Sequence, residues 1–185
     1  MINAIKQNVA LDVLRTDCVD IGSEEEATVV LSLLSHILDK ENSSGHLSLS
    51  APEVNVMTRA AIVRMADFSI DLINPQILEY GKKIISFGEM CTSFPDHHLN
   101  CIRHDYIVIS TGLPNKRETI HLIGMAAILV EHEVDHLNKS LFFDKAIRMA
   151  MVRGDGSISN HDFCPCGSRK KYIECCTINS TLCLK

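Results

Sequence analysis

Two histidines four residues apart, His132 and His136, lie at the end of a long apolar stretch of the chain. Residues at i and i+4 share one face of a helix, so both imidazoles can reach a single metal ion. Glu133 follows the first histidine, where a carboxylate can act as a base toward metal-bound water. The alternative is a pair of surface histidines, but ionisable groups at the end of an apolar helix are costly without partners. The HEVDH segment therefore indicates a metal site that could support hydrolysis.

A third ligand must come from another part of the chain, because a catalytic metal site usually has three protein ligands and one open position. The candidates are Cys91, His97, His98, Cys101, His104 and His121. Cys91 is attractive on chemical grounds, because it follows the strand-like sequence IISFGEM and precedes the turn-like sequence SFP.

The elements that must position these residues mix helical and strand patterns. Ser23 before three glutamates is a helix N-cap signature, and the apolar spacing that follows predicts a helix over 24–40. Runs rich in β-branched residues predict strands at 59–64, 84–87 and 106–110. The segment 119–137 is apolar on almost every side before Glu131, which predicts a second, buried helix. Strands around one buried helix indicate an α+β fold, with small antiparallel or mixed sheets packed around the HEVDH helix.

The chain has 185 residues, enough for one catalytic domain and a short appendage. We predict a main domain over 1–150, a linker over 151–163 that contains glycine, serine and aspartate, and a cysteine-rich tail over 164–185.

Apolar residues make up 46% and charged residues 22% of the chain, which excludes a wholly disordered protein. The net charge of −5 gives no reason to expect direct, sequence-specific contact with nucleic acid.

The chain also shows no sign of a membrane or export signal. No stretch approaches the roughly 20 apolar residues of a membrane-spanning helix. The N-terminal segment MINAIKQNVALDVLRTD lacks the apolar core and the cleavage site of a signal peptide. We therefore expect a cytoplasmic protein that makes no membrane contact.

Three segments of the main domain together resemble the three sequence motifs of peptide deformylases, in the order of that family. HEVDHLNKSLFFD, residues 132–144, resembles H-E-x-D-H-L-x-G-x-L-F-x-D. EMCTSFP, residues 89–95, resembles E-G-C-L-S-x-P, and HLSLSAPEV, residues 46–54, resembles G-x-G-L-A-A-P-Q-V. The similarity runs from about residue 10 to residue 150.

This resemblance implies that Cys91, His132 and His136 hold one catalytic divalent ion, usually Fe²⁺ in the family, with Zn²⁺, Ni²⁺ or Co²⁺ as substitutes. The implied reaction is hydrolysis of the N-formyl group from the initiator formyl-methionine of nascent polypeptides, with Glu133 as general base and acid. The oxyanion would be stabilised by the ion, by the backbone N–H of Thr92 and by the first-motif side chain, here Glu53.

Less direct roles follow from the same resemblance. Glu89 is expected to pair with Arg103, and Asp135 to orient a neighbouring strand or ligand. The candidates for the apolar pocket that would hold a methionine side chain are Leu49, Phe87 and Ile128.

Several residues depart from the family pattern near the expected site. Glu53 replaces a glutamine whose amide would donate to the oxyanion, and loss of one such donor typically costs roughly 10²–10³ in rate. His46, Ser48 and Met90 replace glycines and could narrow the cleft. Further departures are Thr92 in place of leucine and Lys139 in place of the glycine after the ligand helix.

The alternative function is a catalytically impaired binding module that acts through the tail. A metalloprotease is less favoured, because no distant third ligand follows the HEVDH segment.

The tail holds four cysteines within 13 residues, in the sequence FCPCGSRKKYIECC. They are Cys164, Cys166, Cys175 and Cys176. Four thiolates can close a tetrahedral structural zinc site, and so short a segment would depend on the ion to fold. The tail resembles the SEC-C zinc-binding motif, and this resemblance implies a docking module for the ribosome or a chaperone. The remaining cysteines of the chain, Cys18, Cys101 and Cys183, are expected to have no role in a site.

Overall fold

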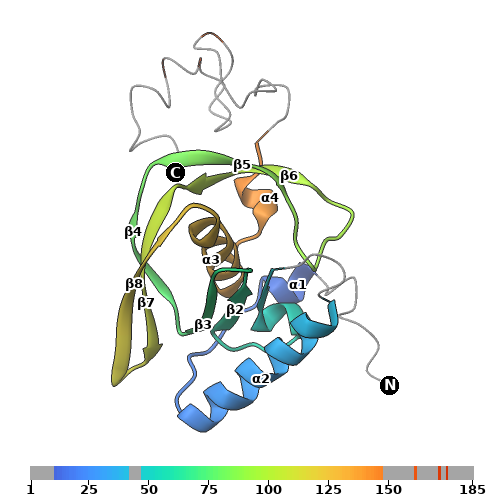
Figure 1. Cartoon of the computed structure of the whole chain (residues 1–185). Coiled ribbons are helices and arrows are strands. Elements are labelled where there is room, and N and C mark those ends of the chain that lie inside the picture. Colours follow the sequence, from blue (N-terminus) through green and yellow to red (C-terminus); the bar gives the residue numbers. More distant parts are fainter. Residues whose placement is uncertain (1–10, 42–46, 148–160, 162–170, 172–173, 175–185) are drawn as a thin grey trace.

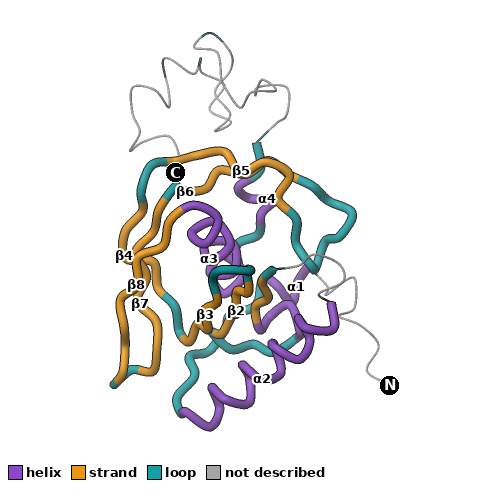
Figure 2. Tube along the Cα trace, viewed as in Figure 1, coloured by secondary structure: helices purple, strands orange, loops and turns teal. Residues whose placement is uncertain are grey.

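The computed structural model describes residues 11–41, 47–147, 161, 171 and 174 (Figure 1). The described part is an α+β fold built from three small antiparallel sheets, as the sequence predicts. Helix α3 (Gly124–Leu137) lies near the centre, with strands around it, and α2 (Glu24–Glu41) lies to one side (Figures 1 and 2). Within the described residues, no helix is long and apolar enough to cross a membrane.

Helix α2 confirms the predicted first helix. The Oγ of Ser23 accepts the backbone N–H of Glu26 at 3.1 Å, and the Glu26 carboxylate accepts the backbone N–H of Gly22 at 3.2 Å. These bonds satisfy amides that the first turn of a helix leaves unpaired. The apolar face of α2, with Leu34 and Leu38, packs in one core cluster.

The strands form three separate sheets. The first sheet orders β1 (Ser48–Ser50), β2 (Ala60–Arg64) and β3 (Ser69–Ile73). The second orders β4 (Gln76–Tyr80), β7 (Tyr106–Leu113) and β8 (Lys116–Ile123), and the third pairs β5 (Lys83–Glu89) with β6 (Leu99–His104). Strands β2, β5 and β7 confirm the three predicted strands, whereas the other five were not predicted.

The predicted helix over 119–137 is wrong in its first part. Residues up to Ile123 belong to β8, which pairs in continuous antiparallel register with β7. Gly124 has φ of +58° and donates its N–H to the carbonyl of Asp105 at 2.8 Å, so the chain turns there before the helix begins. An apolar stretch fits a buried helix and a strand equally well, and the ladder with β7 decides between them.

Helix α3 packs against strands of all three sheets. Its first turn is accessible, with Met125 half-exposed, while its second half is almost completely buried. Ala127, Val130 and Val134 pack in the core cluster that contains residues of β2 and β7. The expected burial of the HEVDH segment is therefore confirmed.

The remaining helical elements are short. They are α1 (Leu11–Leu14), the 3₁₀ turn η2 (Ala51–Val54) and α4 (Phe142–Lys145). Arg15, next to α1, donates two hydrogen bonds to Asp144 of α4, at 2.6 and 2.9 Å. This pair ties the start of the described chain to the segment that follows α3.

Candidate metal centre

Three donor atoms converge at one point inside the fold. The Nε2 of His136 lies 3.3 Å from the Sγ of Cys91 and 3.2 Å from the Nε2 of His132. Cys91 comes from the turn after β5, and both histidines come from α3. All three residues are at least 95% buried, and one ligand atom from each lies within 4.8 Å of the others. The predicted third ligand therefore reaches the histidine pair.

The chemistry of these three residues fits a divalent metal ion. His132 has its Nδ1 atom 2.7 Å from the Oε1 of Glu89, so its other ring nitrogen is free to act as a ligand. His136 directs Nε2 to the same point, and its Nδ1 has no hydrogen-bond partner among the described residues. A thiol and two imidazole nitrogens have too few protons for all three atoms to form hydrogen bonds with one another at these distances. Thiolate and neutral imidazole are, however, ligands of zinc and iron.

A buried arginine holds the carboxylate behind His132. The Arg103 side chain is fully buried, and its Nε donates to the Oε2 of Glu89 at 3.0 Å. Its Nη1 donates to Asp135 at 2.5 Å, and Glu131 lies 3.9 Å away. Burial raises the pKa of Glu89, but the hydrogen bonds from His132 and Arg103 outweigh it and lower that pKa to about 2. The predicted contacts of Glu89 and Asp135 are both present, and they link β5, β6 and α3.

Glu133 lies in the same buried region with a carboxylate oxygen to spare. The side chain is 2% exposed, and its Oε2 has no hydrogen-bond partner within the described chain. Burial and the nearby charge of Glu53 raise the pKa of Glu133 well above the usual carboxyl value. The group can therefore keep a proton that an exposed glutamate would lose.

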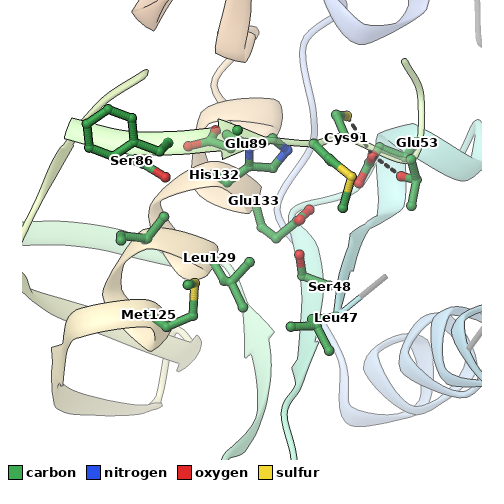
Figure 3. Close-up of a pocket in the computed structure, with 15 residues that line it drawn as sticks. Leu47, Ser48, Glu53, Ser86, Glu89, Cys91, Met125, Leu129, His132 and Glu133 are labelled. Atoms are coloured by element: carbon green, nitrogen blue, oxygen red, sulfur yellow. Dashed lines mark hydrogen bonds and ion pairs between the residues drawn. The ribbon is translucent and has the colours of Figure 1, made fainter. Parts of the chain in front are cut away.

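Glu53 is also buried, and its two carboxylate oxygens face different partners. Oε2 accepts the backbone N–H of Ser50 at 2.9 Å and the Ser50 hydroxyl at 2.7 Å. Oε1 accepts the hydroxyls of Thr92 at 2.5 Å and Ser93 at 3.2 Å, and it lies 3.4 Å from the Sγ of Cys91. Burial raises the pKa of Glu53, but the charge of His136 and the hydrogen bond from Thr92 have the larger combined effect, so the pKa of Glu53 lies below the ordinary carboxyl value. Figure 3 shows Glu53 beside Cys91.

Ser50 and Ser93 are contacts of Glu53 that the predictions from the sequence do not include. A signal for the first was present, because Ser50 and Glu53 form the S-x-x-E pattern of a capping box at the start of η2. No comparable pattern marks Ser93. Its contact with Glu53 depends on the fold bringing the turn after β5 against η2.

A pocket opens beside these residues, with Glu53, Cys91, His132 and Glu133 in its lining (Figure 3). Phe87 and Ile128 line it as predicted. Leu49 does not line this pocket: it is fully buried and packs in the core cluster with α2. The apolar side chains at the rim are 39–54% exposed; they are Leu47, Phe87, Met90 and Met125.

Two of the residues that replace family glycines lie at this pocket. Ser48 and Met90 both contribute to its lining, and the narrowing of the cleft by their side chains stays a prediction. His46 lies outside the described residues. Lys139 has φ of +62°, a left-handed conformation that favours glycine, and it follows the end of α3.

The other candidate ligands serve elsewhere. His104 lies 3.1 Å from Glu131, and His97 packs edge-on against Phe94 and Phe143. Cys101 is buried with its Sγ 3.4 Å from the carbonyl oxygen of Phe142. His98 and His121 are exposed, outside the converging group. Cys164, Cys166, Cys175, Cys176 and Cys183 lie outside the described residues.

Comparison with known proteins agrees with this geometry. The family of polypeptide deformylases matches residues 5–151 of the chain. Peptide deformylase of Picosynechococcus sp. is 32% identical over 122 residues, which are 63% of this chain and 65% of that protein. Peptide deformylase 1 of Bacillus subtilis is 34% identical over 116 residues, which are 61% of this chain and 72% of that protein. The chain thus spans just under two thirds of the first of these relatives.

Solved structures show the same fold. Peptide deformylase from Thermotoga maritima superposes with a TM-score of 0.65 at 24% identity, over 74% of this chain and 92% of that one. Peptide deformylase from Plasmodium falciparum superposes with a TM-score of 0.65 at 27% identity, over 74% and 83%. The chain belongs to the peptide deformylase family. This assignment gives no support to the metalloprotease alternative.

Proposed function

We propose that the protein is a metal-dependent hydrolase that removes the N-formyl group from the initiator formyl-methionine of nascent polypeptides. Membership of the peptide deformylase family supports this activity. The observation that carries it is the convergence of Cys91, His132 and His136 beside a pocket in which Glu133 has an unpartnered carboxylate oxygen. The comparisons give no support to the alternative of a binding module that acts through the tail.

Cys91, His132 and His136 would hold one divalent ion, with Fe²⁺ as the expected metal and Zn²⁺, Ni²⁺ or Co²⁺ as substitutes. When bound, the ion would supply Lewis acidity and make water available as a nucleophile near neutral pH. The Glu89–Arg103 pair fixes the ring of His132, which keeps its Nε2 directed at the ion.

Glu133 would act as general base and then as general acid. In its ionised form Glu133 can accept a proton from the attacking water at Oε2, and the same oxygen can deliver that proton to the leaving amine. The raised pKa of Glu133, caused by burial and by Glu53, favours the second of these steps, because it stabilises the protonated form.

The developing oxyanion would receive a hydrogen bond from the backbone N–H of Thr92. Glu53 cannot supply the amide donor that the family pattern expects at its position, because its carboxylate accepts hydrogen bonds on both oxygens. We therefore expect slow turnover in the natural protein.

The substrate's methionine side chain would enter the pocket lined by Phe87, Ile128 and Leu129. Apolar walls around a few polar groups are typical of small-ligand sites, and an unbranched thioether fits irregular apolar space. The exposed rim residues Phe87 and Met90 would then lie near the peptide chain that follows.

The remaining assignments are proposals about the whole chain. We propose a catalytic domain over 1–150, a linker over 151–163, and a SEC-C-like tail over 164–185 that holds a structural Zn²⁺. The zinc ligands would be Cys164, Cys166, Cys175 and Cys176. A tail that docks on the ribosome or a chaperone would raise the local concentration of the enzyme near nascent chains in the cytoplasm.

One assay tests the proposed activity. The protein is loaded anaerobically with Fe²⁺ or Ni²⁺, and formate release from formyl-Met-Ala-Ser is measured for the natural chain and for Glu53→Gln and Glu133→Ala. We expect Glu53→Gln to raise the rate at least about tenfold, and Glu133→Ala to abolish it. If no variant releases formate while each still binds metal, the proposed activity is wrong.

A further inference from the structure

We propose that Glu53 is a fourth protein ligand of the metal centre. Its Oε1 atom would occupy the coordination position that a hydrolytic metal site leaves open, and a substrate would have to displace it. This inference rests on the proposed function only for the presence of a divalent ion at Cys91, His132 and His136, and it does not depend on the substrate.

The spacing of the donor atoms fits a set of four metal ligands. Zinc-to-ligand bonds of about 2.0–2.3 Å at tetrahedral angles place neighbouring ligand atoms about 3.3–3.6 Å apart. Glu53 Oε1 lies 3.4 Å from the Sγ of Cys91 and 3.7 Å from the Nε2 of His136. Those two ligand atoms are 3.3 Å apart, and the two histidine nitrogens are 3.2 Å apart. Four of the six edges of the ligand tetrahedron thus have nearly the expected lengths.

The charges of Cys91 and Glu53 also favour a cation between them. A metal-bound Cys91 is a thiolate, so it can no longer donate a hydrogen bond to Glu53. Two buried anions 3.4 Å apart repel strongly in a low-dielectric interior unless a cation lies between them. A divalent ion that contacts both atoms removes this repulsion. The neutral glutamine of the family pattern creates no such requirement.

Hydrogen bonds hold the Glu53 carboxylate in a fixed orientation. Oε2 is held by the backbone N–H and the hydroxyl of Ser50, which leaves Oε1 as the oxygen that lies 3.4 Å from the Sγ of Cys91. The hydroxyls of Thr92 and Ser93 both donate to Oε1, and a carboxylate oxygen offers about two lone-pair sites, so a cation would replace the longer of these two contacts, the one from Ser93. Contacts of this kind orient metal-binding carboxylates in other proteins.

A fourth ligand would alter the properties of the centre. With one thiolate and one carboxylate, the charge of a divalent ion is fully balanced, whereas a glutamine at position 53 would leave one positive charge. More ligand charge increases affinity for the ion. The same balance decreases the ion's ability to stabilise a developing anion. The natural chain should therefore bind metal tightly and turn over substrate slowly.

The test uses the full-length protein loaded with Co²⁺, whose visible absorption is much stronger in four-coordinate sites than in sites of higher coordination. We expect Glu53→Gln to change this spectrum and to release Co²⁺ to a chelator at least tenfold faster than the natural chain. Because both proteins carry the same tail, any contribution from its cysteines cancels in the difference.

Two controls separate coordination from charge. Glu53→Asp keeps the charge but withdraws the oxygens by one methylene, so it should behave like Glu53→Gln. Glu118→Gln makes the same chemical change on an exposed part of β8, so it should leave both the spectrum and the release rate unchanged.

The outcomes also distinguish this inference from the proposed function. If Glu53→Gln leaves the spectrum and the release rate as they are in the natural chain, Glu53 is not a ligand, even if the variant is a faster deformylase. If the spectrum and the release rate change as expected but no variant releases formate, the fourth ligand is supported and the proposed reaction is wrong.

Discussion

The Nδ1 atom of His132 lies 2.7 Å from the Oε1 of Glu89, and this contact connects the metal centre to the framework of the fold. Glu89 ends β5, and Arg103 on β6 holds its carboxylate. Asp135 binds the same arginine from α3, one turn from His132. The ligand helix and the strand that leads to Cys91 are therefore linked through one buried cation.

The contact between His132 and Glu89 should determine metal affinity. Glu89→Gln removes the charge that strengthens the hydrogen bond to the ring, while its amide oxygen can still accept. Loss of such a partner typically costs 10- to 100-fold in affinity, and we expect a decrease of about tenfold. Competition with a chromophoric chelator measures it, with Glu118→Gln as the matched control. Equal affinities in all three proteins would show that Glu89 does not support the ligand.

The buried arginine should be a major contributor to stability. Arg103→Leu leaves Glu89, Glu131 and Asp135 without their shared cation, and breaking a buried ion pair on one side costs about 3–5 kcal/mol. Denaturant unfolding monitored by circular dichroism measures the loss. Arg15→Leu removes an exposed ion pair with Asp144 and should cost about 1 kcal/mol or less. Similar losses in the two variants would contradict the special role of Arg103.

Lys139 adopts a left-handed conformation after α3, where the family pattern has glycine. Its N–H bonds to the carbonyl of His136 and the N–H of Ser140 to that of Asp135, which is the Schellman arrangement at a helix end. We expect Lys139→Gly to raise the free energy of unfolding by about 0.5–1 kcal/mol, because glycine adopts this conformation without strain. Lys139→Ala keeps the strain and should bring no gain. A stabilising alanine variant would mean that the lysine side chain, not the backbone, is unfavourable.

The exposed pair of Arg15 and Asp144 should give a small, pH-dependent contribution to stability. The hydrogen bonds from Arg15 hold the pKa of Asp144 below its ordinary value of 3.8. A carboxyl whose pKa is lower in the folded state stabilises above its unfolded value, and this stabilisation is lost as the pH falls through the folded value. The difference in unfolding free energy between the natural chain and Asp144→Asn should therefore be constant at neutral pH and should decrease below pH 3.8. A difference that grows in acid would contradict the direction of this shift.

The sequence identifies those elements whose signals are local. Ser23 and the glutamates after it mark the start of α2, and the capping bonds are present. The pairing of His132 and His136 follows from their i, i+4 spacing on one helix. Both features depend on local contacts, so a pattern of residue types is sufficient to predict them. Cys91 was one of six candidate third ligands, and only the resemblance to the peptide deformylase motifs singled it out.

Other features depend on partners far away in the chain. Nothing in the sequence of β6 marks Arg103 as fully buried, because its burial requires carboxylates from β5 and from α3. The apolar residues before Gly124 were assigned to a helix, and only their pairing with β7 makes them a strand. The second set of contacts to Glu53, from Thr92 and Ser93, likewise appears only when η2 meets the turn after β5.

The most direct test of the metal centre is X-ray absorption at the nickel edge of the full-length protein loaded with Ni²⁺. This measurement sees only the scatterers around nickel, so zinc elsewhere in the chain does not contribute. We expect one sulfur and two histidine nitrogens around the ion, and loss of the sulfur in Cys91→Ser. A nickel environment with no sulfur, or one unchanged in Cys91→Ser, would contradict the convergence of Cys91, His132 and His136 on one ion.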